Sequence, residues 1–238
     1  DRAATSDAKT TQQRAWALLT GVLLAMAAAV KPVALPVALP MAWALRRHVG
    51  AMAVMATAMV ATLLLLYVPF AMAESGLSGL AATVQRFLDA WAFNGSMHAL
   101  LHGALGSKLA ADRACAAMLL LVLLLITFGR IERWRGVMLF LLAGVLLSST
   151  AHPWYLLWAL PFVAVRFDPA VWLLSLTIAS SYALYFLPRD ATAARILPWA
   201  EYLPVYLALA ITAWQTLRLR EQHRAIVTPA ATGPADNR

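Results

Sequence analysis

The chain has 238 residues, of which 62% are hydrophobic and 13% are charged, with a mean hydropathy of +0.72. This composition excludes an ordinary soluble domain, which has roughly 45–50% apolar and about 25% charged residues, and the apolar excess excludes a disordered chain. The formal charge is +8, and the one cysteine, Cys115, excludes an intramolecular disulfide. In a membrane protein, net charge bears first on loop topology. The composition therefore predicts an integral membrane protein with several spans and no nucleic-acid partner.

The first fourteen residues are polar and small, unlike a signal peptide, which places positive charge before a short apolar stretch. Residues 1–14 are predicted to be a cytoplasmic loop. We expect the chain to be the carboxyl-terminal part of a longer protein, so that part of the function lies upstream.

Eight apolar segments follow, and they predict an all-α fold, a polytopic bundle of transmembrane helices. A single helix over residues 15–45 would be about 46 Å long, too long for a hydrocarbon core of roughly 30 Å. Two helical hairpins, broken at Lys31-Pro32 and His152-Pro153, fit better. Residues 218–238 are predicted to be a disordered cytoplasmic tail. The segments are residues 15–30, 33–45, 51–73, 114–129, 136–149, 154–165, 170–187 and 203–217.

The distribution of Lys and Arg predicts the orientation of this bundle. With eight alternating segments, twelve basic residues in short loops fall on one side and six fall on the other. Because short cytoplasmic loops are enriched in basic residues, both ends of the chain are expected in the cytoplasm. Both hairpin tips then lie at the outer, periplasmic face of a plasma (inner) membrane.

The longest loop, residues 74–113, is also expected at the outer face. Apolar residues recur at three- and four-residue steps from Leu77 to Trp91, which predicts an amphipathic helix on the membrane surface. Asn94-Gly95 favours a turn, and a second short apolar segment follows at residues 97–105.

Lys31 and His152 are the first candidates for a site. Each is an ionisable residue directly before a proline, at a break between apolar segments. Irregular backbone and ionisable groups are tolerated at membrane depth mainly where they are buried in protein or line a watery cavity. The alternatives are a lysine that snorkels to the interface and a histidine that is hydrogen-bonded at a hairpin tip.

Three motifs follow one another along the chain. They are Lys31-Pro32 with Pro36 and Pro40, Trp91-Ala92-Phe93-Asn94-Gly95-Ser96, and His152-Pro153-Trp154-Tyr155 with Trp158 and Pro161. In this order they resemble the carboxyl-terminal half of polytopic GT-C glycosyltransferases, in particular glycosyltransferase family 87 and polyprenyl-phosphate-mannose-dependent mannosyltransferases. The resemblance covers residues 15 to about 217. It implies an enzyme that moves a hexose such as mannose from a polyprenyl-phosphate carrier to a glycan or lipid acceptor at the outer face.

The resemblance implies roles for five residues. Lys31 and His152 are expected to bind the lipid phosphate, and Trp91, Asn94 and Tyr155 to bind the sugar or the acceptor. The catalytic carboxylate is expected upstream of residue 1, so the catalytic residue is unknown here. None of the outer carboxylates is singled out by a motif; they are Glu74, Asp89, Asp112, Asp190 and Glu201.

No cofactor is assigned, although a divalent metal is left open. His98 and His102 have the spacing of helical metal ligands, but no third ligand stands at a recognisable distance, so no metal site is assigned. A transporter or flippase for a lipid-linked or anionic solute is the alternative function, because broken helices with polar residues also build transport sites. An inert scaffold segment is a third interpretation.

Overall fold

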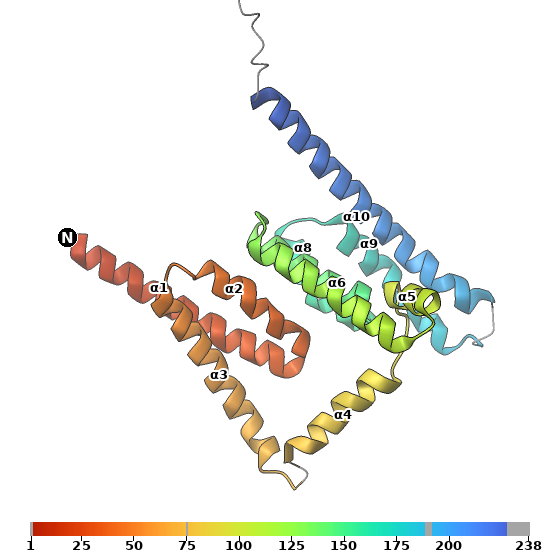
Figure 1. The fold of residues 1–238 in the computed structure, drawn as a ribbon, viewed down its shortest axis with the longest axis horizontal. Coiled ribbons are helices and arrows are strands. Elements are labelled where there is room, and N and C mark those ends of the chain that lie inside the picture. Colours follow the sequence, from red (N-terminus) through yellow and green to blue (C-terminus); the bar gives the residue numbers. More distant parts are fainter. Residues whose placement is uncertain (1, 75, 189–191, 228–238) are drawn as a thin grey trace, which may run out of the picture. The chain divides into compact units, whose positions relative to one another are not determined.

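A computed structural model describes residues 2–74, 76–188 and 192–227 (Figure 1). The structure is 84% helical, and its described part contains no β-strand. The chain divides into two compact units, Asp1–Phe162 and Val163–Arg238. The predicted all-α helical membrane fold is confirmed.

The first unit begins with a helical hairpin that packs against a third helix. A small core of Ala17, Ala51 and Met55 joins α1 to α3, and residues of α2 pack against it. At Gly21 the two helices approach so closely that a Cβ atom would clash with the carbonyl oxygen of Met55. The elements are α1 (Arg2–Val30), η1 (Pro32–Val37), α2 (Ala38–Ala44) and α3 (Val49–Ala71).

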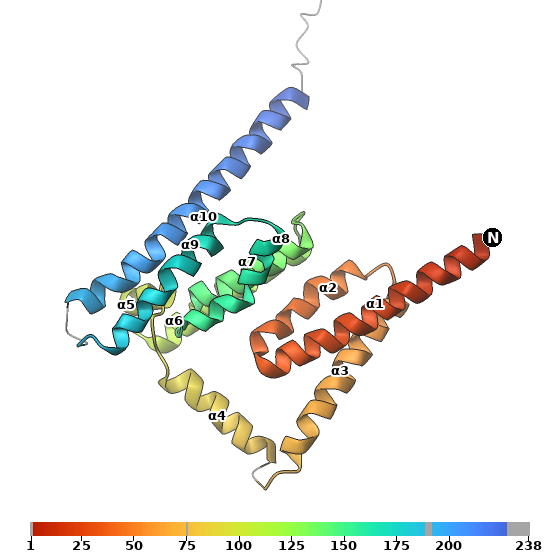
Figure 2. The ribbon, with the colours of Figure 1, turned by 180° about the vertical axis from the view of Figure 1, so that it is seen from behind.

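The remainder of the first unit consists of the helix α4 and a second group of packed helices. Figure 2 shows α7 alongside α6, and the structure gives contacts of α6 with α5 and of α7 with η2. The buried residues of α7 include Phe140, Leu142 and Val145. The elements are α4 (Gly76–Ala90), α5 (Met97–Leu105), α6 (Lys108–Phe128), α7 (Arg133–Leu147) and η2 (Pro153–Trp158), before α8 (Leu160–Val165) at the boundary of the two units.

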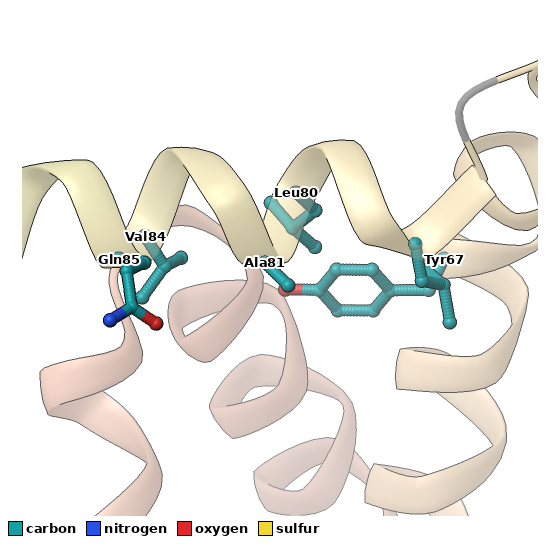
Figure 3. Close-up of a pocket in the computed structure, with 6 residues that line it drawn as sticks. Tyr67, Leu80, Ala81, Val84 and Gln85 are labelled. Atoms are coloured by element: carbon teal, nitrogen blue, oxygen red, sulfur yellow. The ribbon is translucent and has the colours of Figure 1, made fainter.

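The helix α4 has the predicted amphipathic form. Leu80, Ala81 and Val84 lie along one face, and Tyr67 from α3 reaches toward them (Figure 3). Together with Leu77 and Gln85 they line an open, mostly apolar hollow of about 510 Å³. The three- and four-residue steps in the sequence therefore predicted this helix and its apolar face correctly.

Both helix breaks contain the same local feature, a residue before proline, although α7 already ends at Leu147, before the second of them. Lys31 and His152 each precede a proline and have extended backbone, with φ/ψ of −146°/114° and −85°/151°. A residue before proline is pushed away from the α conformation, and the proline itself lacks the N–H that would continue the helix. In each case the chain restarts as a 3₁₀ helix, η1 or η2, and then continues as an α-helix.

The second unit is built on one long helix. The side chain of Asp168 accepts hydrogen bonds from the amides of Ala170 and Val171 and so caps α9. Thr177 donates a hydrogen bond to the carbonyl of Glu201 on α10 at 2.9 Å. The elements are α9 (Pro169–Thr177), η3 (Ile178–Tyr185) and α10 (Thr192–Val227).

All eight predicted segments are helical, but they differ in length. Among the described residues, four helices are long and apolar enough to cross a membrane, and the other segments are shorter. Most apolar residues of these four helices are exposed, as lipid-facing helices require. The four are Ala8–Val30, Val49–Ala71, Lys108–Phe128 and Ile196–Leu219.

Two boundaries differ from the prediction. Residues 2–14 belong to α1 and are not a loop, and α10 continues to Val227 where a disordered tail was expected from residue 218. The predicted boundaries were taken from hydropathy, which marks the part of a helix that lies in lipid. Ala, Gln, Lys and Arg in these stretches are good helix formers, so the helices continue beyond their apolar segments. Residues 228–238 lie outside the described residues.

The close contact at Gly21 gives a testable prediction. Replacing Gly21 with Ala should lower the free energy of unfolding by roughly 1–3 kcal/mol, because the backbone of α3 must move away. Gly103 is the matched control: apart from its chain neighbours and the backbone of its own helix, nothing lies within 4 Å of the position of its Cβ, so Gly103→Ala should be neutral or stabilising. Thermal unfolding in mild detergent, followed by circular dichroism, measures both. Equal midpoints for the two variants would contradict the close packing of α1 on α3.

Candidate functional site

The site is organised by a short backbone pairing between two segments far apart in sequence. The Phe93 amide donates to the carbonyl of Ser149 at 3.0 Å, and the Ala151 amide donates to the carbonyl of Phe93 at 2.8 Å. Isolated bridges join Phe93 and Asn94 to Thr150. The segment after α4 is thereby fixed against the segment after α7.

The turn at Asn94-Gly95 makes this pairing fit. Asn94 has a left-handed backbone, with φ of 53°, a conformation that asparagine tolerates better than most residues. A Cβ on Gly95 would lie 3.0 Å from the carbonyl oxygens of Ser148 and Ser149, so the backbone approach is close. Asn94 Nδ2 donates to the carbonyl of Ala151 at 3.4 Å, and Ser96 Oγ donates to that of Leu146 at 2.9 Å.

His152 lies between two aromatic rings. Its imidazole stacks on Phe93, with a centroid distance of 4.8 Å and planes 22° apart, and on Trp154, at 4.3 Å and 11°. Trp91 and Tyr155 meet the ring edge-on at 6.3 and 5.6 Å. Only 5% of His152 is exposed, so its position is set by packing on several sides.

Lys31 reaches the same cluster from the first helix break. Its Nζ atom lies 4.6 Å from the centroid of the Tyr155 ring and 5.9 Å from that of Trp158. These two rings are themselves stacked at 4.6 Å. The negative face of an aromatic ring attracts an ammonium group within about 6 Å, so the two rings hold the Lys31 charge in place.

The electrostatics of the cluster favour one cation beside one neutral imidazole. Burial lowers the pKa of His152 below its ordinary value, and the positive charge of Lys31 lowers it further. At neutral pH the imidazole therefore has one N–H donor and one acceptor nitrogen. Among the side chains that the structure describes, Lys31 forms no ion pair with a carboxylate. The cluster can therefore offer a positive charge to an anion.

The structure brings together all five predicted residues, Lys31, His152, Trp91, Asn94 and Tyr155. Asn94 is buried and bonds the backbone, so it anchors the turn. Three aromatic partners were missed as site residues although they stand within the motifs: Phe93, Trp154 and Trp158. Trp91 and Trp154 are 50% and 46% exposed, so part of each side chain is accessible from outside the cluster.

The two histidines at four-residue spacing have a different arrangement from a metal pair. His98 is buried, and its Nε2 atom lies 2.8 Å from Asp112 Oδ1, while Lys108 Nζ lies 2.9 Å from Asp112 Oδ2. The rings of His98 and His102 are 6.3 Å apart. Within the described residues no group of three His, Cys, Asp or Glu side chains could hold a metal ion. Asp112 thus links α6 to α5 through its contact with His98.

The other carboxylates that were predicted at the outer face stand in varied surroundings. Asp89 accepts a hydrogen bond from Gln85 on α4, and Glu74 is exposed. Glu201 is buried in the second unit, where Ser180 donates to its Oε2 atom at 3.1 Å. Asp190 lies outside the described residues. These contacts assign a catalytic base to none of them.

Comparison with known families gives one match. Residues 104–221, just under half of the chain, match the family model described as MptB C-terminal domain. This part of the chain is similar to a mannosyltransferase. The match supports a mannosyltransferase-like membrane enzyme, and it gives no support to the narrower assignment to glycosyltransferase family 87. The matched range contains His152 and Tyr155, whereas Lys31, Trp91 and Asn94 precede it. No curated protein and no solved structure matches the chain.

The lowered pKa of His152 gives a prediction about acid stability. A histidine held neutral in the folded state stabilises the fold fully above its ordinary pKa of about 6.5. As the pH falls through that value, the unfolded chain binds the proton first and the free energy of unfolding decreases. We expect the thermal midpoint to fall between pH of about 7.5 and 5.5, and to fall less in His152→Gln. His102→Gln is the control, because His102 is exposed. An unchanged pH dependence in His152→Gln would contradict the neutral, buried imidazole.

Proposed function

We propose that this chain carries the donor-phosphate and sugar site of a GT-C-type mannosyltransferase that uses a polyprenyl-phosphate-linked hexose at the outer membrane face. The observation that carries the proposal is the single cluster in which Lys31 meets the aromatic rings around His152. The match to MptB C-terminal domain supports transfer chemistry over the transporter alternative. The acceptor is proposed to be a glycan or a lipid.

The proposed reaction needs positive charge where the phosphate leaves. An acceptor hydroxyl attacks the anomeric carbon, the bond from that carbon to the phosphate oxygen breaks, and the polyprenyl phosphate leaves with the electron pair. The hydroxyl proton passes to a base, which we do not assign among the described residues. Lys31 stabilises the departing phosphate as a fixed cation, and the N–H of neutral His152 donates a hydrogen bond to it.

The aromatic surfaces of the cluster suit a sugar ring. Trp91 and Trp154 each expose about half of their surface, and both rings contact the His152 imidazole. The phenol of Tyr155, beneath the Lys31 ammonium, adds a hydroxyl group that bonds sugar hydroxyls. In this arrangement Asn94 acts as a positioning residue, because it holds the turn that carries Trp91 and Phe93.

Retention of the lipid phosphate tests the proposal without requiring turnover. The full chain is purified in mild detergent, delipidated and titrated with undecaprenyl phosphate, and the complex is scored by native mass spectrometry. Lys31→Ala should weaken binding about tenfold, in line with loss of a hydrogen bond to a charged group. His152→Ala should weaken it several-fold, and Lys31→Arg should retain most of it.

Two matched controls separate the site from general effects of charge and packing. Lys108→Ala removes another lysine of the same unit, and His102→Ala removes an exposed histidine; both should bind as wild type does. Circular dichroism confirms that each variant remains helical. Equal binding in wild type, Lys31→Ala and His152→Ala, or no binding by wild type, would overturn the proposed phosphate site.

A further inference from the structure

We infer a second binding site, for the headgroup of an anionic phospholipid, at the opposite end of the first unit. The amino-terminal part of α1, the end of α2, α3 and the start of α7 line an open pocket of about 500 Å³. Lys9 and Arg133 line it, one from α1 and the other from the first position of α7. This inference does not rest on the proposed transferase function.

The polar residues of the pocket suit a phosphate. Lys9 and Arg133 supply two cations, and Gln12 and Gln13 supply two amide groups that can donate hydrogen bonds. Among the side chains that the structure describes, neither cation forms an ion pair with a carboxylate. The nearest acidic residues in sequence are Asp7, two positions before Lys9, and Glu132, which is exposed and directly precedes Arg133. Among the described side chains, the two cations of the pocket therefore have no carboxylate counter-ion.

The remaining walls of the pocket are apolar except for Thr20, whose hydroxyl donates to the carbonyl of Trp16, and this favours an amphiphile over a free anion. Ala17 and Met55 are 3% and 2% exposed and belong to the core between α1 and α3. Met41 and Leu45 from α2 add apolar surface, and Trp16 is 62% exposed beside them. A phospholipid can place its phosphate at the two cations and its acyl chains along the apolar walls. Inorganic phosphate can contact only the cations and amides.

Further basic residues surround the same end of the unit. Arg14 lies against Gly50, where an added Cβ would be 3.5 Å from its Nη2 atom. Arg46 lies over Trp43 at 4.7 Å and donates to the Trp43 carbonyl. Basic pockets between transmembrane helices bind anionic headgroups in this way, and juxtamembrane Lys and Arg residues strengthen the attraction to an anionic membrane surface.

The position along α1 also fits a lipid of the other membrane face. Lys9 lies in α1, and Lys31 directly follows the last residue of that helix. The two are about 22 residues apart, which is roughly 33 Å at about 1.5 Å per residue. That length matches a hydrocarbon core of roughly 30 Å. The pocket and the Lys31 cluster are therefore separate sites at opposite ends of one span.

Lipid titration tests the inference. The full chain is delipidated in mild detergent and titrated with phosphatidylglycerol or, separately, with phosphatidylcholine, and bound lipid is scored by native mass spectrometry. Lys9→Ala and Arg133→Ala should each weaken phosphatidylglycerol binding about fivefold, and the double variant about thirtyfold. Arg47→Ala is the matched control, because it removes one exposed cation of the same end outside the pocket and should bind as wild type does.

The outcomes separate a lipid site from unspecific attraction and from binding of the headgroup alone. Tight phosphatidylglycerol binding that Lys31→Ala leaves intact supports a site independent of the proposed transferase function. Equal binding of both lipids, or equal losses in Arg47→Ala and in the pocket variants, would overturn it by showing unspecific attraction. Full competition by glycerol phosphate at the lipid's own concentration would also overturn it, because the apolar walls would then contribute nothing. A midpoint of thermal unfolding equal to wild type in the double variant shows that it folds.

Discussion

Two backbone hydrogen bonds of Phe93, one to Ser149 and one from Ala151, hold together the two loops that carry most of the candidate site. Each bond contributes only about 0.5–1.5 kcal/mol net, yet they fix the register between two loops. Without that register Phe93 would not stack on His152, and the Trp91 ring would not meet its edge. The left-handed Asn94 and the close approach at Gly95 serve this same contact.

The sequence predicted the helix breaks because proline acts locally. Pro32 and Pro153 determine the conformation of the residue before them whatever surrounds them, so both breaks fall where they were expected. The topology predicted from the Lys and Arg residues put both breaks at the same face of the membrane. That prediction was enough to group Lys31 with His152. Span lengths were less predictable, because hydropathy marks apolar stretches without showing where a 3₁₀ helix interrupts them.

The stacking partners of the site could not be predicted by periodicity. Phe93 and Thr150 are 57 residues apart and meet through an isolated bridge, which leaves no repeating pattern in either segment. Trp154 and Trp158 stood in the motif, but interfacial anchoring accounts for a tryptophan at a helix end equally well. Only the three-dimensional structure shows that one stacks on His152 and the other lies under Lys31.

The family match and the cluster together show how the two parts of the first unit depend on each other. The matched range, residues 104–221, includes His152 and Tyr155 but begins after the other half of the cluster. A chain reduced to that range would lose Phe93 from one face of the imidazole and Lys31 from above the Tyr155 ring. His152 would then be more exposed, and the nearby positive charge that lowers its pKa would be gone. The chemistry proposed for the matched domain therefore requires the hairpin and the surface helix that precede it.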